Sequence, residues 1–190
     1  MPPEERRSAI VAVTVPLLRE HGRSVTTSQI AKAAGVAEGT IFRAFGTKDE
    51  LVDEAIRTAL DFRPHVAEIA ALDRSGTLED RLLRIATVMH RRFTSIFELM
   101  AAVGMMGPPD IAKGAPHGHH GPRDDRDRVA RVLIEALGPT DGELRVSAQR
   151  AISLLRTLTF AGCNPHMSGG DVLSPEDVVE LLLHGIRKDS

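Results

Sequence analysis

Apolar residues recur at intervals of three and four along most of this chain, and that spacing limits the folds it can adopt more than any other feature. From Leu82 the pattern passes through Ile85, Met89, Phe93 and Ile96. Such spacing places the apolar side chains on one face of a helix with about 3.6 residues per turn. Leu, Ala, Arg and Glu, which favour helices, dominate these segments. No segment is a convincing strand, so the sequence predicts an all-α protein.

Capping residues and glycines divide the chain into about nine predicted helices. Threonine, serine, proline and first-turn acids favour helix starts, and glycine favours helix ends. The predicted helices cover residues 3–21, 28–34, 37–45, 48–62, 65–72, 78–106, 123–137, 141–161 and 174–187. Thr27 and Thr47 are the expected caps of the second and fourth helices. Residues 107–122 contain four Gly and four Pro and are expected to form a loop.

The charge balance indicates that any nucleic-acid contact is local. The chain has 24 Lys and Arg against 26 Asp and Glu, so it does not resemble a protein that coats polyanions. Residues 1–48 have seven basic and four acidic side chains, an excess that permits DNA binding there. Cys163 is the only cysteine, which excludes an internal disulfide. No leader-like or membrane-spanning segment is evident, so a cytoplasmic protein is expected.

The segment from Thr27 to Leu51 has the most informative pattern. Small side chains at Ala31 and neighbouring positions allow a second helix to cross the first closely, and Gly35 supplies the turn between them. Ile41 can then hold the pair together. A helix-turn-helix of this kind presents the N-terminal end of its second helix to the major groove of DNA.

The expected DNA-contacting residues lie on the second helix and at two helix starts. Those on or near the groove-facing side of the second helix are Ala37, Glu38, Gly39, Thr40, Phe42 and Arg43. Thr27 and Lys48 lie at helix starts, which suit phosphates. Arg43 is the best candidate for a base contact, ideally with guanine, and Gly39 permits close approach. The alternatives are a salt bridge between Arg43 and Glu38, and a three-helix unit that serves as scaffold only.

Residues 27–51, TSQIAKAAGVAEGTIFRAFGTKDEL, resemble the DNA-binding signature of the TetR (tetracycline repressor-like) family over roughly the first quarter of the chain. The resemblance implies a helix-turn-helix formed by the second and third helices and a connecting fourth helix. It also implies a divergent helical C-terminal domain for ligand binding and dimerisation. The expected division is a DNA-binding domain in residues 1–47 and an effector-binding and dimerisation domain in residues 48–190.

Three positions depart from the family pattern. Where the family often has a hydroxylated residue, a basic residue and a tyrosine, this chain has Ala37, Glu38 and Phe42. Phe42 has no phenolic hydroxyl to donate to a phosphate. Glu38 would repel the DNA backbone unless it reads a cytosine amino group or pairs with Arg43.

The resemblance also implies an effector pocket among the central helices. The residues expected to line it are Met89, Phe93, Phe97, Met100, Leu155 and Phe160. Flexible thioethers and aromatic rings suit a pocket for varied apolar ligands, although core packing explains the same stripe. Candidates for a polar contact in this pocket are His65, His90, Arg91, Arg92 and His166, and nothing in the sequence selects among them.

The last two predicted helices, about residues 143–161 and 174–187, carry apolar faces that can pair with a second copy as a four-helix bundle. Packing within one chain is the alternative. We favour a homodimer, because two helix-turn-helix units can read both halves of a palindromic operator.

Together these features predict a repressor that binds double-stranded operator DNA and is released by a small, hydrophobic effector. We find no nucleophile-base pair, glycine-rich phosphate loop or metal-ligand spacing, so no enzyme, cofactor or metal site is expected. His117, His119 and His120 lie among glycines and prolines that supply no fixed ligand geometry. The alternatives are a ligand carrier or helical enzyme with a vestigial N-terminal module, and a protein-interaction adaptor.

Overall fold

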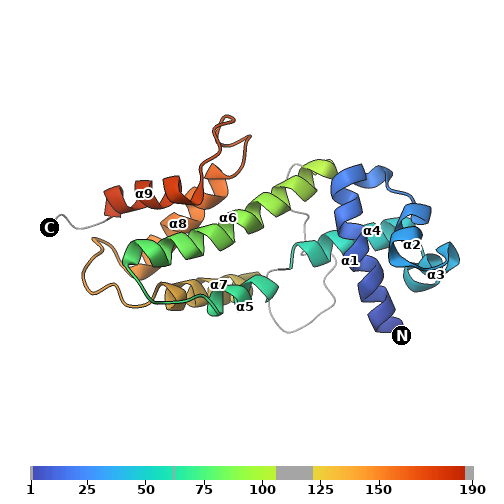
Figure 1. The fold of residues 1–190 in the computed structure, drawn as a ribbon, viewed down its shortest axis with the longest axis horizontal. Helices are drawn as coiled ribbons and strands as arrows, with labels where there is room; N and C mark the ends of the chain where they lie inside the picture. Colours follow the sequence, from blue (N-terminus) through green and yellow to red (C-terminus); the bar gives the residue numbers. More distant parts are fainter. Residues whose placement is uncertain (1, 62, 106–121, 187–190) are drawn as a thin grey trace. The chain divides into compact units, whose positions relative to one another are not determined.

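The computed structural model describes residues 2–61, 63–105 and 122–186, and every regular element in these ranges is a helix (Figure 1). The predicted all-α class is confirmed. In chain order the elements are α1 (Pro3–His21), η1 (Gly22–Ser24), α2 (Thr27–Ala34), α3 (Glu38–Phe45), α4 (Lys48–Ala59), α5 (Arg63–Ala70), α6 (Leu78–Ala102), α7 (Pro122–Leu137), α8 (Ala148–Gly162) and α9 (Pro175–Ile186). The predicted loop at 107–122 lies almost wholly outside the described residues.

The helix α2 is capped by Thr26 and not, as predicted, by Thr27. The Thr26 hydroxyl oxygen accepts a hydrogen bond from the Gln29 backbone N–H (3.2 Å), and the Gln29 side chain accepts one from the Thr26 backbone N–H (2.8 Å). This reciprocal pair satisfies two backbone donors at the start of the helix. Thr27 is therefore the first residue of α2, and its hydroxyl is available for another partner. Gly35 ends α2 with φ 65°, a conformation that favours glycine.

Four other predicted helices have different ends. The helix α5 covers Arg63–Ala70 and not the predicted 65–72, and α6 ends at Ala102 and not at the predicted residue 106. The helix α4 stops at Ala59, so it is shorter than the predicted 48–62. The helix α8 begins at Ala148, well after the predicted residue 141. Ser147 caps α8, because its side chain accepts a hydrogen bond from the Arg150 backbone N–H (3.2 Å). Leu144 lies before α8 and is buried. Its place in the apolar pattern therefore results from burial and not from a helix.

The described residues pack into two units, and the first contains residues 2–61 and 96–105. Its largest fully buried side chains include Ile10, Leu18, Ile30, Ile41 and Leu51, which come from α1, α2, α3 and α4. Packing therefore groups α4 with the helix-turn-helix. The predicted boundary at residue 47 separates DNA binding from effector binding and dimerisation, and this division of functions remains a prediction.

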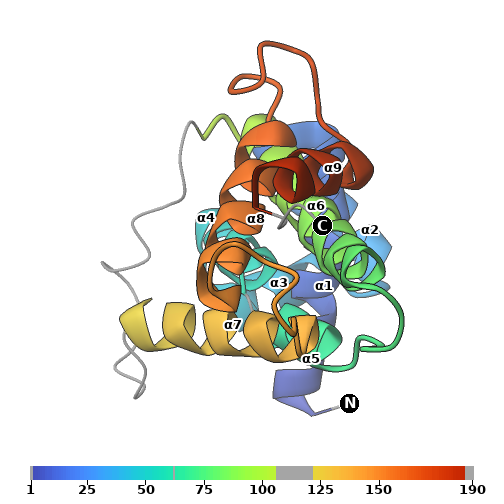
Figure 2. The ribbon, with the colours of Figure 1, turned by 90° about the vertical axis from the view of Figure 1, so that its left-hand side faces the viewer.

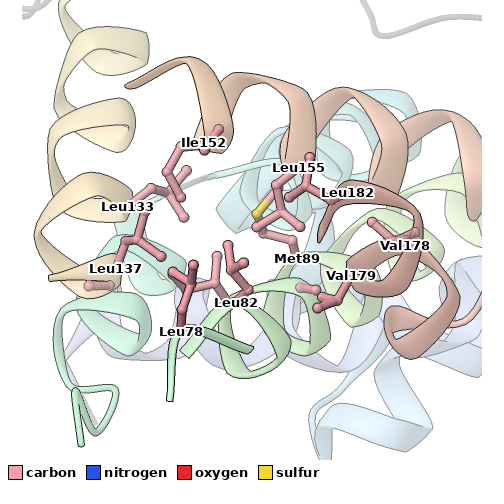
Figure 3. Close-up of a cluster of buried hydrophobic side chains, with 14 of the residues drawn as sticks. Leu78, Leu82, Met89, Leu133, Leu137, Ile152, Leu155, Val178, Val179 and Leu182 are labelled. Carbon is pink, nitrogen blue, oxygen red and sulfur yellow. The ribbon is translucent and has the colours of Figure 1, made fainter. Parts of the chain in front are cut away.

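The second unit contains residues 63–95 and 122–186. In it α8 packs beside α9, and α5 beside α7 (Figure 2). Ile152, Leu155, Val178 and Leu182 meet in its core (Figure 3). These residues belong to the faces predicted to form a dimer interface, so much of those faces packs within the chain. The helix α6 contributes residues to both units.

Candidate nucleic-acid interface

The helix α3 has one buried side and one exposed side. Ile41 and Phe45 are 0% and 4% exposed and hold α3 against the core of its unit. The exposed side chains are at Glu38, Phe42 and Arg43, together with Gly39, and Thr40 is half-buried. Residues three and four positions apart are neighbours on a helix surface. Phe42 has these spacings to Gly39 and Glu38, and Arg43 lies four positions after Gly39, so these residues form a continuous exposed stripe. Ala37, also exposed, is the N-cap of α3.

Arg43 extends toward the N-terminal end of this stripe. Its Nη2 atom lies 3.9 Å from the point where a Cβ atom at Gly39 would be. Long helical side chains commonly lean toward the helix N-terminus in this way. Among the described residues, no acidic group pairs with Arg43. The alternative of a salt bridge between Arg43 and Glu38 is therefore wrong, and the guanidinium remains available to a partner outside the chain.

Thr27, the first residue of α2, holds the side chain of Glu38, the first residue of α3. The Thr27 hydroxyl donates a hydrogen bond to Oε1 of Glu38, because a carboxylate can only accept. Glu38 is the first residue of α3, where a negative charge is favourable at the helix N-terminus. Thr27 was predicted to contact phosphate, and the structure gives its hydroxyl a partner within the protein.

Lys48 lies at the start of α4, whose N-cap is Thr47. Its Nζ atom donates to the backbone oxygen of Arg23 in η1, at 2.9 Å. An ammonium group has three donors, so this bond leaves donors for a phosphate. The phosphate contact of Lys48 remains a prediction.

Arg7 supports α3 from α1, and the sequence analysis did not single it out. Its guanidinium lies over the Phe45 ring, with Cζ 4.3 Å from the ring centroid. The same group pairs with Glu54 of α4 and donates to the backbone oxygen of Ala44. These partners lie 37 or more positions away in the sequence, so no local spacing signals them.

The residues predicted to form an effector pocket do not share one environment. Met89 and Leu155 are buried in the core of the second unit (Figure 3). Phe93 packs edge-on against Phe160, with ring centroids 5.3 Å apart and an interplanar angle of 88°. Phe97 and Met100 belong to the first unit. A role of these six residues in effector binding remains a prediction.

Within the described ranges, no three His, Cys, Asp or Glu side chains are grouped so that they could hold a metal ion. His117, His119 and His120 lie outside the described residues. None of the helices in those ranges is long and apolar enough to cross a bilayer.

In the described residues α2, Gly35 and α3 form a helix-turn-helix whose second helix has one exposed side, which is the arrangement found in DNA-binding helix-turn-helix proteins. Residues 10–55 match the model of the family described as bacterial regulatory proteins, tetR family. The N-terminal part of the chain is therefore similar to the TetR family, as the expected resemblance predicted.

Curated relatives match the N-terminal part of the chain. The HTH-type transcriptional repressor KstR2 of Rhodococcus jostii is 36% identical over 80 residues, which are 39% of this chain and 38% of the relative. The HTH-type transcriptional regulator BetI of Agrobacterium fabrum is 33% identical over 91 residues, or 47% of this chain and 42% of the relative. The chain thus spans about two fifths of the length of these relatives. Both are named as transcriptional regulators and not as enzymes.

Solved structures share the fold over nearly the whole chain. A TetR-family transcriptional regulator from Mesorhizobium loti covers 99% of this chain and all of its own, with a TM-score of 0.64 and 17% identity. A TetR transcriptional regulator from Agrobacterium tumefaciens covers 97% of this chain and 96% of its own, with a TM-score of 0.58 and 22% identity. At these identities the likeness establishes the fold alone.

Proposed function

We propose that this chain is a transcriptional repressor in the cytoplasm, without enzymatic activity. In this proposal a homodimer binds a palindromic operator, and a small hydrophobic effector releases it. One observation carries the DNA-binding part of the proposal: the stripe of α3 formed by Glu38, Gly39, Phe42 and Arg43 is exposed while the opposite side of the helix is buried. The names of relatives such as KstR2, a repressor, favour negative regulation.

The chemistry of the stripe suits the major groove. The Arg43 guanidinium has a planar fork of donors that matches O6 and N7 of guanine. No acidic partner among the described residues holds it, so binding a base breaks no ion pair. Gly39 has no side chain beside Arg43, which lets the helix backbone approach the bases.

A gel-shift titration with the DNA upstream of the chain's own gene tests this part of the proposal. Arg43→Ala should weaken operator binding by about 1–3 kcal/mol and relax the preference for one base pair. Arg131→Ala is a matched control, because it removes an exposed cation from α7 in the second unit. Absence of sequence-preferring binding by the wild type at low salt would refute the repressor function.

The dimer part of the proposal rests on apolar side chains that remain exposed on α8 and α9. Leu181 is 56% exposed and Phe160 is 39% exposed, although neighbouring residues on both helices are buried. A twofold interface along α8 and α9 would cover these side chains. It would also supply the second recognition helix needed for a palindrome, with half-sites spaced by about 34–36 Å.

The effector part rests on the interior of the second unit. The Nε2 atom of His90 and the Oγ atom of Ser168 are buried without a hydrogen-bond partner among the described residues. A buried polar group without a partner costs about 1–3 kcal/mol. An effector with an apolar body and a polar group would satisfy such an atom and contact the ring of Phe93. The sequence alone did not distinguish His90 from the exposed Arg91 and His166.

Effector control requires that the ligand bind the DNA-free form better than the DNA-bound form. A hundredfold difference in affinity corresponds to about 2.7 kcal/mol of coupling. Screening apolar compounds by the shift in melting temperature and then by release of operator DNA tests this. Phe93→Ala should weaken binding of any compound found, and a compound that stabilises the protein without releasing DNA would contradict effector control.

A further inference from the structure

We infer that Glu38, oriented by Thr27, is a specificity-determining residue that reads the exocyclic amino group of a cytosine in the operator. This inference rests on the proposed DNA-binding function. It concerns one of the three positions at which the chain departs from the TetR pattern, since a basic residue is common there where Glu38 stands.

An acidic residue on a DNA-binding face needs a compensating donor. The Glu38 carboxylate is exposed at the leading end of α3, where it would meet the negative phosphates if it faced the DNA backbone. Two arrangements remove the repulsion: an ion pair with Arg43, or a contact with a base amino group. The structure has no such ion pair between these two described residues.

The bond from Thr27 fixes the orientation of the carboxylate. A free glutamate side chain samples many rotamers, and ordering it on binding would cost conformational entropy. The Thr27 hydroxyl occupies only one acceptor position on Oε1. A carboxylate has about four such positions, so Glu38 retains acceptors while its direction is set by α2.

Cytosine is the base that this acceptor fits. Its N4 amino group is a donor in the major groove, and Glu and Asp accept from it there. Adenine also has an amino group, but its N7 acceptor lies beside it and would face the carboxylate unfavourably. Arg43 leans back over Gly39 toward the same end of α3, so a donor and an acceptor lie together on the leading stripe. This combination suits a cytosine close to a guanine.

Selection from a randomised pool of double-stranded DNA, using the full chain, tests the inference. The wild type should select half-sites with one fixed cytosine. Glu38→Gln should shift the preference at that base pair from cytosine to adenine, because a glutamine amide bonds to both N6 and N7 of adenine. Glu38→Ala should lose discrimination there by on the order of 5- to 150-fold.

Thr27 provides the test of orientation. Thr27→Val removes the hydroxyl while keeping a branched side chain, and it should weaken the cytosine preference at the same base pair. Thr27→Ser keeps the hydroxyl and should restore that preference. Ser28→Ala, at the exposed neighbouring position, is the control and should leave every base preference unchanged.

Two results would overturn the inference while the proposed function survives. In the first, Glu38→Ala raises affinity for all sequences equally, which would mean that Glu38 only repels phosphate. In the second, Glu38→Gln lowers the melting temperature with no change in the selected sequence, which would limit Glu38 to stabilising the start of α3. Failure of the wild type to select any sequence would instead refute the proposed function.

Discussion

The guanidinium of Arg7 in α1 lies 4.3 Å above the centre of the Phe45 ring, at the C-terminal end of α3. Its Nε atom also donates to Oε1 of Glu54 in α4, at 2.9 Å. This bond to Glu54 raises the pKa of the Arg7 guanidinium above its usual value. One side chain therefore connects three helices and contacts the side of α3 opposite its exposed stripe.

Replacing Arg7 should destabilise the first unit and weaken DNA binding. We expect Arg7→Ala to lower the free energy of unfolding by about 1–2 kcal/mol, since it removes a charged hydrogen bond and a cation-aromatic contact that are partly screened by solvent. Arg7→Lys should recover less than half, because an ammonium lacks the planar fork. Urea unfolding of Arg7→Ala, Glu54→Ala and the double variant measures the coupling. Strictly additive effects would contradict the connection.

Phe42 is 47% exposed on the recognition stripe and lacks the hydroxyl that the family often has at this position. We expect Phe42→Tyr to raise operator affinity by about 0.5–1.5 kcal/mol, because the phenol can donate to a phosphate oxygen. The gain in affinity should be the same for the operator and for an operator with altered bases, because a contact with a phosphate does not depend on the base sequence. Fluorescence-anisotropy titrations with both DNAs check this. A gain restricted to one base sequence would argue for base contact instead.

Leu181 and Leu155 provide a matched pair for separating dimerisation from folding. Leu181 of α9 is 56% exposed, whereas Leu155 of α8 is fully buried in the second unit. Leu181→Asp should shift the dimer toward monomer in sedimentation velocity, with the helical circular dichroism unchanged. Leu155→Ala should lower the free energy of unfolding by about 2–5 kcal/mol, through lost burial and the cavity left behind. A Leu181→Asp variant that remains dimeric would place the interface elsewhere.

Asp80 makes the start of α6 sensitive to acid. Its Oδ2 atom accepts hydrogen bonds from the backbone N–H and the hydroxyl of Thr77, at 2.9 and 2.8 Å. The backbone bond first, and the hydroxyl bond second, lower the pKa of Asp80 below its usual 3.8. A carboxyl whose pKa is lower in the folded state stabilises the fold above the unfolded-state pKa, and this contribution is lost as pH falls through the folded-state value.

We therefore expect the free energy of unfolding to decrease on acidification below about pH 4, in part through Asp80. Asp80→Asn should be less stable than the wild type at neutral pH and should show a weaker dependence on acid. Urea unfolding at a series of pH values measures both quantities. Glu79→Gln, in the same first turn, is the control, and an identical acid dependence in Asp80→Asn and wild type would remove Asp80 from the explanation.

Local sequence was sufficient to predict the helices and the helix-turn-helix. The apolar period, the glycine at position 35 and the threonine at position 47 each act within a few residues of themselves, so their consequences are visible without a fold. The face of α3 that is exposed was also predictable, because Ile41 and Phe45 mark the opposite, buried side. The first residue of a helix was predicted wrongly where two neighbouring residues of the same type can both cap it, as Thr26 and Thr27 can at the start of α2.

Tertiary structure alone decided which partners the polar side chains take and which apolar faces stay exposed. The bonds of Thr27 to Glu38 and of Arg7 to Glu54 join residues 11 and 47 positions apart, and no sequence interval specifies such pairs. Likewise, the apolar faces of α8 and α9 suited either a second copy or the chain's own core. Packing buried Leu155 and Leu182 and left Leu181 exposed, because a short-range apolar pattern specifies that a face is buried without specifying what covers it.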